Sequence, residues 1–172
     1  AEDAGNSYTI SYSPLSGSVV AFRSMAGRYP STFGNEGNLY NNNSILYDRF
    51  SGSLWAQLPA VCIEGPLRGK RLDRVLIYWA RWGGVKNRFP DAQVLSGATG
   101  FRRTYGRGPY GSYLRPGTYY DDVRIIYPVT AQNNKLPPKT RILGIEIADQ
   151  YGALVVDSVR QKQLLNLSLG LN

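Results

Sequence analysis

The chain has 172 residues, which is enough for one ordinary domain and short for two. Hydrophobic residues make up 42% and aromatic residues 12%, so the chain can bury a core. The formal net charge is +8, and there is no histidine. Without histidine, Ser-His-Asp and Cys-His nucleophile systems and histidine-ligated zinc or haem are excluded. No apolar run reaches the ~20 residues needed to cross a bilayer.

The predicted elements of the first half are short strands joined by tight turns. Residues 7–12 alternate between polar and large apolar side chains, the pattern of a half-buried strand. A tight turn is expected at residues 13–18. Residues 32–43 are rich in Gly and Asn and are predicted to form a loop. The other strands predicted in this half cover residues 18–23, 44–49, 54–58 and 74–79.

The second half contains the one predicted helix, at residues 82–88, which ends before Pro90 because proline disfavours helix in the residue before it. Residues 99–122 are dense in Gly, Tyr and Arg without periodicity, which indicates a long loop of the kind that is usually functional or a binding surface. Further strands are predicted at residues 93–95, 125–127, 141–147 and 153–156.

The last residues alternate between leucine and polar side chains. This pattern predicts a strand at residues 163–172, with one face formed by Leu165, Leu167, Leu169 and Leu171. Such a strand either completes the sheet of its own domain or is exchanged with a neighbouring subunit by strand addition. The sequence therefore predicts a single, mainly β domain over residues 1–172, an antiparallel sandwich or irregular barrel with one short helix and long loops.

The amino terminus and the composition bear on where the protein is located, and the single cysteine limits its chemistry. The first residues, Ala1 to Gly5, resemble the start of a chain from which a signal peptide has been removed. The lone Cys62 can form neither an intrachain disulfide nor a multi-thiolate metal site, and we expect it to be buried. Together with a composition rich in Asn, Ser, Tyr and Gly, the amino terminus favours an exported protein, located extracellularly, at the cell surface or in the periplasm.

The most distinctive motif is the stretch from Tyr12 to Ser18, Y-S-P-L-S-G-S, which runs into an apolar strand. Further segments in matching order and spacing are 39–43, 46–49, 52–57, 65–69, 89–96, 99–100, 105–107, 109–110 and 136–144. In these segments the chain resembles the prokaryotic family catalogued as domain of unknown function 3179, whose motif is Y-C-P-L-C-G-[ST]. Where the family has two cysteines, this chain has Ser13 and Ser16. Serine supports neither disulfide chemistry nor soft-metal binding, so we expect neither from these two residues here.

Two functional hypotheses remain open at this stage. The first is an exported, non-enzymatic structural or binding protein, without a cofactor or metal, which self-associates through its terminal strands into an extracellular assembly. Its motivation is the leucine strand and the absence of an upstream segment like 142–147, which the resembled family commonly has. The second is a ligand- or metal-binding enzyme of that family, with candidate groups Ser13, Ser16, Tyr47, Asp48, Arg49, Arg103 and Arg107.

A third hypothesis, nucleic-acid binding through residues 101–120, rests on interleaved Arg and Tyr side chains. It is disfavoured because no DNA- or RNA-binding motif is present and an exported protein seldom meets such partners. Copies of the same chain are therefore the expected partners, and the identity of any small ligand stays open.

Overall fold

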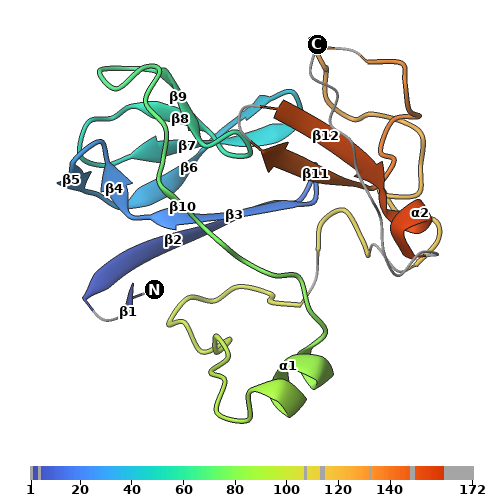
Figure 1. The fold of residues 1–172 in the computed structure, drawn as a ribbon, viewed down its shortest axis with the longest axis horizontal. Coiled ribbons are helices and arrows are strands. Elements are labelled where there is room, and N and C mark those ends of the chain that lie inside the picture. Colours follow the sequence, from blue (N-terminus) through green and yellow to red (C-terminus); the bar gives the residue numbers. More distant parts are fainter. Residues whose placement is uncertain are drawn as a thin grey trace.

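The computed structural model describes residues 2–3, 5–106, 108–112, 115–131, 133–147 and 150–160. These residues form small antiparallel sheets and two short helices, with no closed barrel in the described part (Figure 1), and the mainly β class is confirmed. The strands are β1 (Glu2–Asp3), β2 (Asn6–Ser13), β3 (Ser18–Arg23), β4 (Met25–Ala26), β5 (Tyr29–Pro30), β6 (Phe33–Tyr40), β7 (Asn43–Asp48), β8 (Leu54–Ala56), β9 (Val61–Glu64), β10 (Arg74–Val75), β11 (Ile142–Ile147) and β12 (Gln150–Val155). The helices are α1 (Trp82–Arg88) and α2 (Val156–Arg160).

The amino-terminal sheet has the order β1-β2-β3-β10. Strands β2 and β3 pair as the predicted hairpin, from Tyr8 opposite Arg23 to Ser13 opposite Ser18. The face of β2 that carries Ser13 is turned inward, whereas Ile10 and Tyr12 on the other face are about half exposed. On the more polar face only Ser13 is buried, and it hydrogen-bonds to Ser44 of the second sheet.

The second sheet has the order β6-β7-β8-β9. The prediction of a loop at residues 32–43 is wrong, because β6 occupies most of this range and pairs with β7, with a register shift between Asn35 and Leu39. Its backbone finds hydrogen-bond partners along β7, and this pairing overrides the low strand preference of Gly and Asn. The mostly polar side chains are tolerated because β6 is the edge strand of the sheet.

The turn between β6 and β7 consists of Asn41 and Asn42, both with positive φ (49° and 60°). Positive φ at both central residues is the geometry of a type I′ hairpin turn, which asparagine tolerates. The side chains of the turn bind a distant loop. Asn41 Oδ1 accepts from the backbone N–H of Thr130 (3.0 Å), and Asn42 Nδ2 donates to the carbonyl oxygen of Tyr127 (3.1 Å). The turn thereby fastens residues 127–131 to the second sheet.

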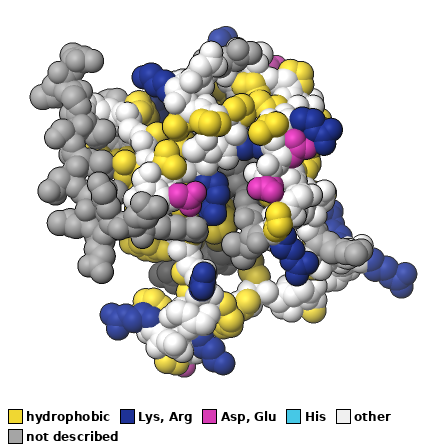
Figure 2. Space-filling view, turned by 90° about the vertical axis from the view of Figure 1, so that its right-hand side faces the viewer, with side chains coloured by type: hydrophobic (Ala, Val, Ile, Leu, Met, Phe, Trp, Pro, Cys, Tyr) yellow, Lys and Arg dark blue, Asp and Glu magenta, His cyan; other side chains and the backbone are white. Residues whose placement is uncertain are grey.

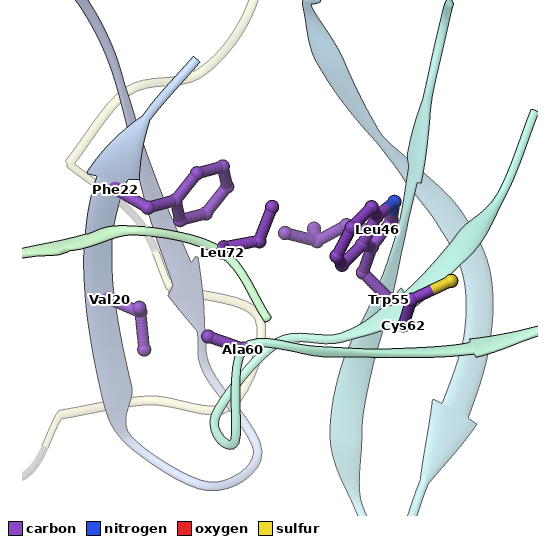
Figure 3. Packing of buried hydrophobic residues seen from close by; sticks show 7 residues of the cluster. All are labelled: Val20, Phe22, Leu46, Trp55, Ala60, Cys62 and Leu72. Atoms are coloured by element: carbon purple, nitrogen blue, oxygen red, sulfur yellow. The ribbon is translucent and has the colours of Figure 1, made fainter. Parts of the chain in front are cut away.

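The hydrophobic core lies between these two four-stranded sheets (Figure 3). Phe22 of β3 faces Leu46 and Trp55 of the second sheet, and Phe22 and Trp55 are fully buried. Phe33 packs against the cluster, with its ring centroid 4.8 Å from that of Phe22. Cys62 is 2% exposed, so its predicted burial is confirmed. The architecture is thus a small sandwich of two antiparallel sheets.

Beyond β9 the predictions fail where no partner strand lies alongside. Of the strand predicted at residues 74–79, only Arg74 and Val75 pair with β3. The strands predicted at 93–95 and 125–127 are irregular in the structure. Short runs of apolar residues form strands only when a second backbone accepts their hydrogen bonds. Helix α1 has the predicted bounds, but none of its residues is buried.

The hairpin of β11 and β12 confirms the pairing predicted near the carboxyl end, with Ile142 opposite Val155 and Ile147 opposite Gln150. An ion pair of 2.9 Å between Arg74 and Glu146 connects the hairpin to β10. The short helix α2, which the sequence did not predict, follows directly. Leu165, Leu167, Leu169 and Leu171 lie outside the described residues. No helix within the described ranges is long and apolar enough to span a membrane.

Candidate functional site

The turn from Tyr12 to Ser18 joins β2 to β3 and carries the two serines of the motif. Gly17 has a φ of +60°, and its N–H donates to the carbonyl oxygen of Pro14 at 3.3 Å, which closes the turn. Ser13 ends β2 and is 1% exposed, whereas Ser16 lies in the turn and is exposed. The two hydroxyls therefore occupy different environments.

Ser13 is bonded to the first residues of β7. Its Oγ accepts hydrogen bonds from the backbone N–H and from the hydroxyl of Ser44, both at 3.1 Å. The backbone donor is buried, so the Ser13 oxygen satisfies a group that would otherwise be costly to bury. Ser13 thus attaches the end of the first hairpin to the second sheet.

Ser16 and Ser18 are bonded to the amide side chains of the second sheet. Asn43 Nδ2 donates to Ser16 Oγ at 2.9 Å, Ser18 Oγ at 3.0 Å and Gln57 Oε1 at 2.8 Å. Ser18 Oγ donates to Gln57 Oε1 at 2.9 Å, and the hydroxyls of Ser16 and Ser18 lie 2.9 Å apart. We call the six residues of this network, Ser13, Ser16, Ser18, Asn43, Ser44 and Gln57, the polar joint.

Gln57 is the centre of the polar joint. Its side chain is fully buried, and all its polar atoms have partners. In addition to the two bonds that Oε1 accepts, Nε2 donates to the carbonyl oxygens of Ser11 (3.1 Å) and Ser18 (3.3 Å). Gln57 thereby binds both strands of the first hairpin while its own backbone N–H donates to the carbonyl oxygen of Ser44. The polar joint thus connects the two sheets by hydrogen bonds.

The joint predicts different effects for the two motif serines. Ser13→Ala should lower the free energy of unfolding by about 1–2 kcal/mol, because the buried N–H of Ser44 loses its acceptor. Ser16→Ala is the matched control, and its effect should stay within about 0.5 kcal/mol because Ser16 is exposed. Urea unfolding followed by circular dichroism measures both. Equal losses for the two variants would contradict the assignment of Ser13 as the buried acceptor.

Asp48, another candidate, lies at the end of β7 and is fully buried. Its carboxylate accepts from the N–H of Ser51 (2.6 Å), the hydroxyl of Ser51 (2.7 Å) and the indole Nε1–H of Trp55 (2.9 Å). Burial alone would raise the pKa of Asp48, but these hydrogen bonds outweigh it and hold the pKa below 3.8. The carboxylate thus stays ionised inside the protein and orders the turn that leads to β8.

Tyr47 and Arg49 lie beside Asp48 in sequence but on the opposite face of the chain. The guanidinium carbon of Arg49 is 5.2 Å from the ring centroid of Tyr47, a cation–π contact. The Tyr47 ring covers Gly34, where a Cβ would come within 2.5 Å of it, so glycine makes room for the ring. This pair packs on the surface of the second sheet and does not join the carboxylate of Asp48.

The remaining candidates belong to the loop after α1. Arg103 is exposed, and its backbone groups bond to Phe101 and Tyr105 of the same loop. Arg107 lies outside the described residues. The structure therefore brings Ser13 and Ser16 together in the polar joint, and places Asp48, the Tyr47–Arg49 pair and Arg103 in separate surroundings.

Sequence reasoning missed Asn43, Ser44 and Gln57, which provide most of the hydrogen bonds of the joint. One signal was available for Gln57. It follows Leu54, Trp55 and Ala56, so it continues an apolar run that predicts a buried strand. A polar residue at such a position is expected to have hydrogen-bond partners.

A second polar cluster surrounds Lys139. Its Nζ donates to the carbonyl oxygens of Tyr119 (2.7 Å) and Asp122 (2.6 Å) and lies 3.7 Å from the ring centroid of Tyr119. Burial lowers the pKa of Lys139, and the negative charge of Asp122 opposes this shift. Hydrogen bonds from Arg124 lower the pKa of Asp122 to about 2. The ammonium group thus orders the 119–122 loop from within.

A hollow of about 630 Å³ adjoins this loop and is lined by Gly117, Thr118, Tyr119, Asp121, Asp122, Arg124, Ile125 and Ile126. The carboxylates on its wall have partners in the protein: Asp122 is bonded to Arg124, and Asp121 Oδ2 accepts from the N–H of Gly117 at 3.1 Å. Among the residues that the structure describes, no three His, Cys, Asp or Glu side chains are grouped as metal ligands would be.

The comparison with family models tests the family resemblance that the Tyr12–Ser18 motif indicated. A model described as "Protein of unknown function (DUF3179)" matches residues 2–172. The chain belongs to the DUF3179 family. No curated protein and no solved structure matches it. In this DUF3179 chain, the two serines of the Y-S-P-L-S-G-S motif are hydrogen-bonding members of the joint between the sheets.

Proposed function

We propose that this protein is an exported structural or binding protein without catalytic activity, and that it associates with copies of itself into an extracellular assembly through the β11–β12 hairpin. The observation that carries the self-association is the exposed apolar face of this hairpin. The motif serines support a non-catalytic role, because their hydroxyls are engaged in fastening the two sheets. The composition rich in Asn, Ser, Tyr and Gly supports export.

The pairing register divides the hairpin side chains between two faces. One face carries Leu143, Ile145, Ile147 and Leu154 and contains no charged residue. Leu143 is 52% exposed and Ile147 is 60% exposed. The opposite face carries Glu146, which accepts from Arg74 at 2.9 Å and from the hydroxyl of Tyr151 at 3.2 Å. The uncharged side is the one that can be covered without burying a charge, and we call it the hairpin face.

A second copy of the chain suits the hairpin face. The chain as a whole carries +8, so copies repel one another over most of their surface, but the hairpin face itself is uncharged. Two such faces related by a twofold axis present the same apolar side chains to each other. Within the described ranges β11 and β12 pair only with each other, and a two-stranded hairpin gains stability when it packs on a further surface.

Sedimentation velocity over a range of protein concentrations tests the proposal. The unmodified protein should sediment as an oligomer that dissociates on dilution. Leu143→Lys should weaken this association by about 100-fold or more, because two leucines leave the contact and two ammonium groups enter it. Ile142→Lys is the matched control, since Ile142 is equally exposed (50%) on the opposite face, and it should leave the association unchanged.

Two outcomes would contradict the proposal. One is an unmodified protein that remains monomeric at the highest concentration reached. The other is an oligomer that Leu143→Lys and Ile142→Lys affect equally, which would place the contact elsewhere. Circular dichroism of both variants verifies that the hairpin change has not unfolded the sandwich.

A further inference from the structure

Residues 76–106 form a segment in which no residue is buried. We call this segment the arm. It leaves the sandwich after β10, includes α1 and lies to one side of the sheets (Figure 1). Most of its large apolar side chains are exposed, among them Leu76, Tyr78, Trp79, Phe89, Val94 and Leu95. A concentration of this kind marks an interaction surface.

The arm is also strongly basic. It contains five cationic residues and one acidic residue, Asp91, so its net charge of +4 is half that of the whole chain. The cationic residues adjoin aromatic ones in sequence: Arg81 precedes Trp82, Arg88 precedes Phe89 and Arg102 follows Phe101. In Figure 2 the lower lobe, at the height of α1 in Figure 1, presents hydrophobic side chains with Lys and Arg side chains at its margin.

The combination of side chains indicates the partner. The positive charge disfavours a second arm, because two surfaces of +4 repel each other. A nucleic acid would neutralise the charge and stack on the aromatic rings, but it offers no hydrocarbon to Leu76, Val94 and Leu95. An anionic lipid surface offers favourable contacts to the cationic, the aromatic and the aliphatic side chains of the arm. Its phosphates attract Arg and Lys, its interface favours Trp and Tyr, and its acyl chains accept aliphatic side chains.

We propose that the arm docks on the surface of an anionic lipid bilayer. Arg81, Lys86 and Arg88 lie at the headgroup phosphates, and the exposed aromatic and aliphatic side chains enter the boundary between headgroups and acyl chains. The contact is peripheral and reversible, and it is independent of the hairpin face proposed for self-association. The Leu143→Lys variant should therefore bind lipid as the unmodified protein does.

Vesicle binding tests the assignment, and tryptophan fluorescence reports on it directly. Trp79 and Trp82 are in the arm, whereas Trp55 is fully buried in the core. Vesicles of phosphatidylcholine with phosphatidylglycerol should shift the emission to shorter wavelength and carry the protein into the pellet on centrifugation. Vesicles of phosphatidylcholine alone should bind far less, and added salt should release the protein.

Two pairs of variants separate the electrostatic contribution to vesicle binding from the contribution of apolar side chains that insert into the bilayer. Lys86→Gln with Arg88→Gln should weaken binding about 30-fold, whereas Lys135→Gln, an exposed lysine outside the arm, should have a much smaller effect. Leu95→Ser should weaken binding about tenfold, whereas Ile10→Ser, an exposed apolar residue of β2, should not. No residue of the arm is buried, so the thermal unfolding temperatures of the arm variants should match that of the unmodified protein.

Several results would overturn the proposal. They are no binding to anionic vesicles, equal binding to both vesicle types, or equal losses for arm and control variants. Double-stranded DNA that binds more tightly than the vesicles and displaces them would reassign the arm to a polyanion. A blue shift that grows with protein concentration in the absence of vesicles would reassign it to self-association.

Discussion

Replacing Gln57 by leucine should lower the free energy of unfolding by about 3–5 kcal/mol, the largest effect expected of any change in the polar joint. Leucine has a similar volume, so the loss arises from hydrogen bonding. The hydroxyl of Ser18 loses Gln57 Oε1 as its acceptor, and the amide of Asn43 loses one of its three acceptors. The carbonyl oxygens of Ser11 and Ser18 lose the donor that Gln57 Nε2 provides. Each unsatisfied buried polar group costs about 1–3 kcal/mol, and these costs are not additive within one network.

Urea unfolding at neutral pH measures the change, with Gln93→Leu as the matched control. Gln93 is exposed, so the same substitution there should alter the free energy of unfolding by no more than about 0.5 kcal/mol. A loss below about 1 kcal/mol for Gln57→Leu would mean that the four groups find other partners or water. The polar joint would then not be what holds the two sheets together.

Asp48→Asn should be the second largest effect, a loss of about 2–3 kcal/mol at neutral pH. The introduced amide has one acceptor oxygen in place of two, so its NH₂ group meets either the N–H of Ser51 or the indole N–H of Trp55. Donor then faces donor at a fully buried position. The negative charge that strengthened all three hydrogen bonds is also lost.

The pH dependence of this difference has a defined sign. The pKa of Asp48 in the folded protein lies below the ordinary value of 3.8. At pH values above 3.8 the ionised carboxylate therefore stabilises the fold, and this stabilisation is lost as the pH falls through the pKa of the folded protein. The difference between Asp48→Asn and the unmodified protein should be full at neutral pH and should shrink progressively below 3.8. Denaturant unfolding at successive pH values measures it. A difference that stays constant down to the lowest pH would contradict an ionised Asp48.

The candidate site was predictable only in part. The motif from Tyr12 to Ser18 identified the turn and the family, and both are confirmed. The partners of its serines were not predictable, because Asn43, Ser44 and Gln57 lie 25 to 39 residues along the chain from the serines they bind. Nothing local to the motif distinguishes a hydroxyl that binds a ligand from one that binds a neighbouring strand.

Alternating polar and apolar residues, together with turn-forming and helix-ending residues, determined the elements whose partners are near in the chain. The hairpin of β2 and β3, the hairpin of β11 and β12 and the bounds of α1 before Pro90 are of this kind. Their hydrogen bonds close over short loops, so local preference and pairing agree. Family membership was likewise readable from the sequence, because it depends on residue order alone.

Only the tertiary structure decided which faces are buried and which apolar runs find a partner. Strand β6 exists because β7 lies beside it, although its Gly and Asn residues favour a loop. Ser13 of β2 is buried because the backbone N–H and the hydroxyl of Ser44 donate to its Oγ, while Ile10 and Tyr12 stay exposed. The apolar residues from 76 to 79 have no such partner within the described chain, so they remain on the surface. Burial depends on the second surface that an element meets, and that surface comes from a distant part of the chain.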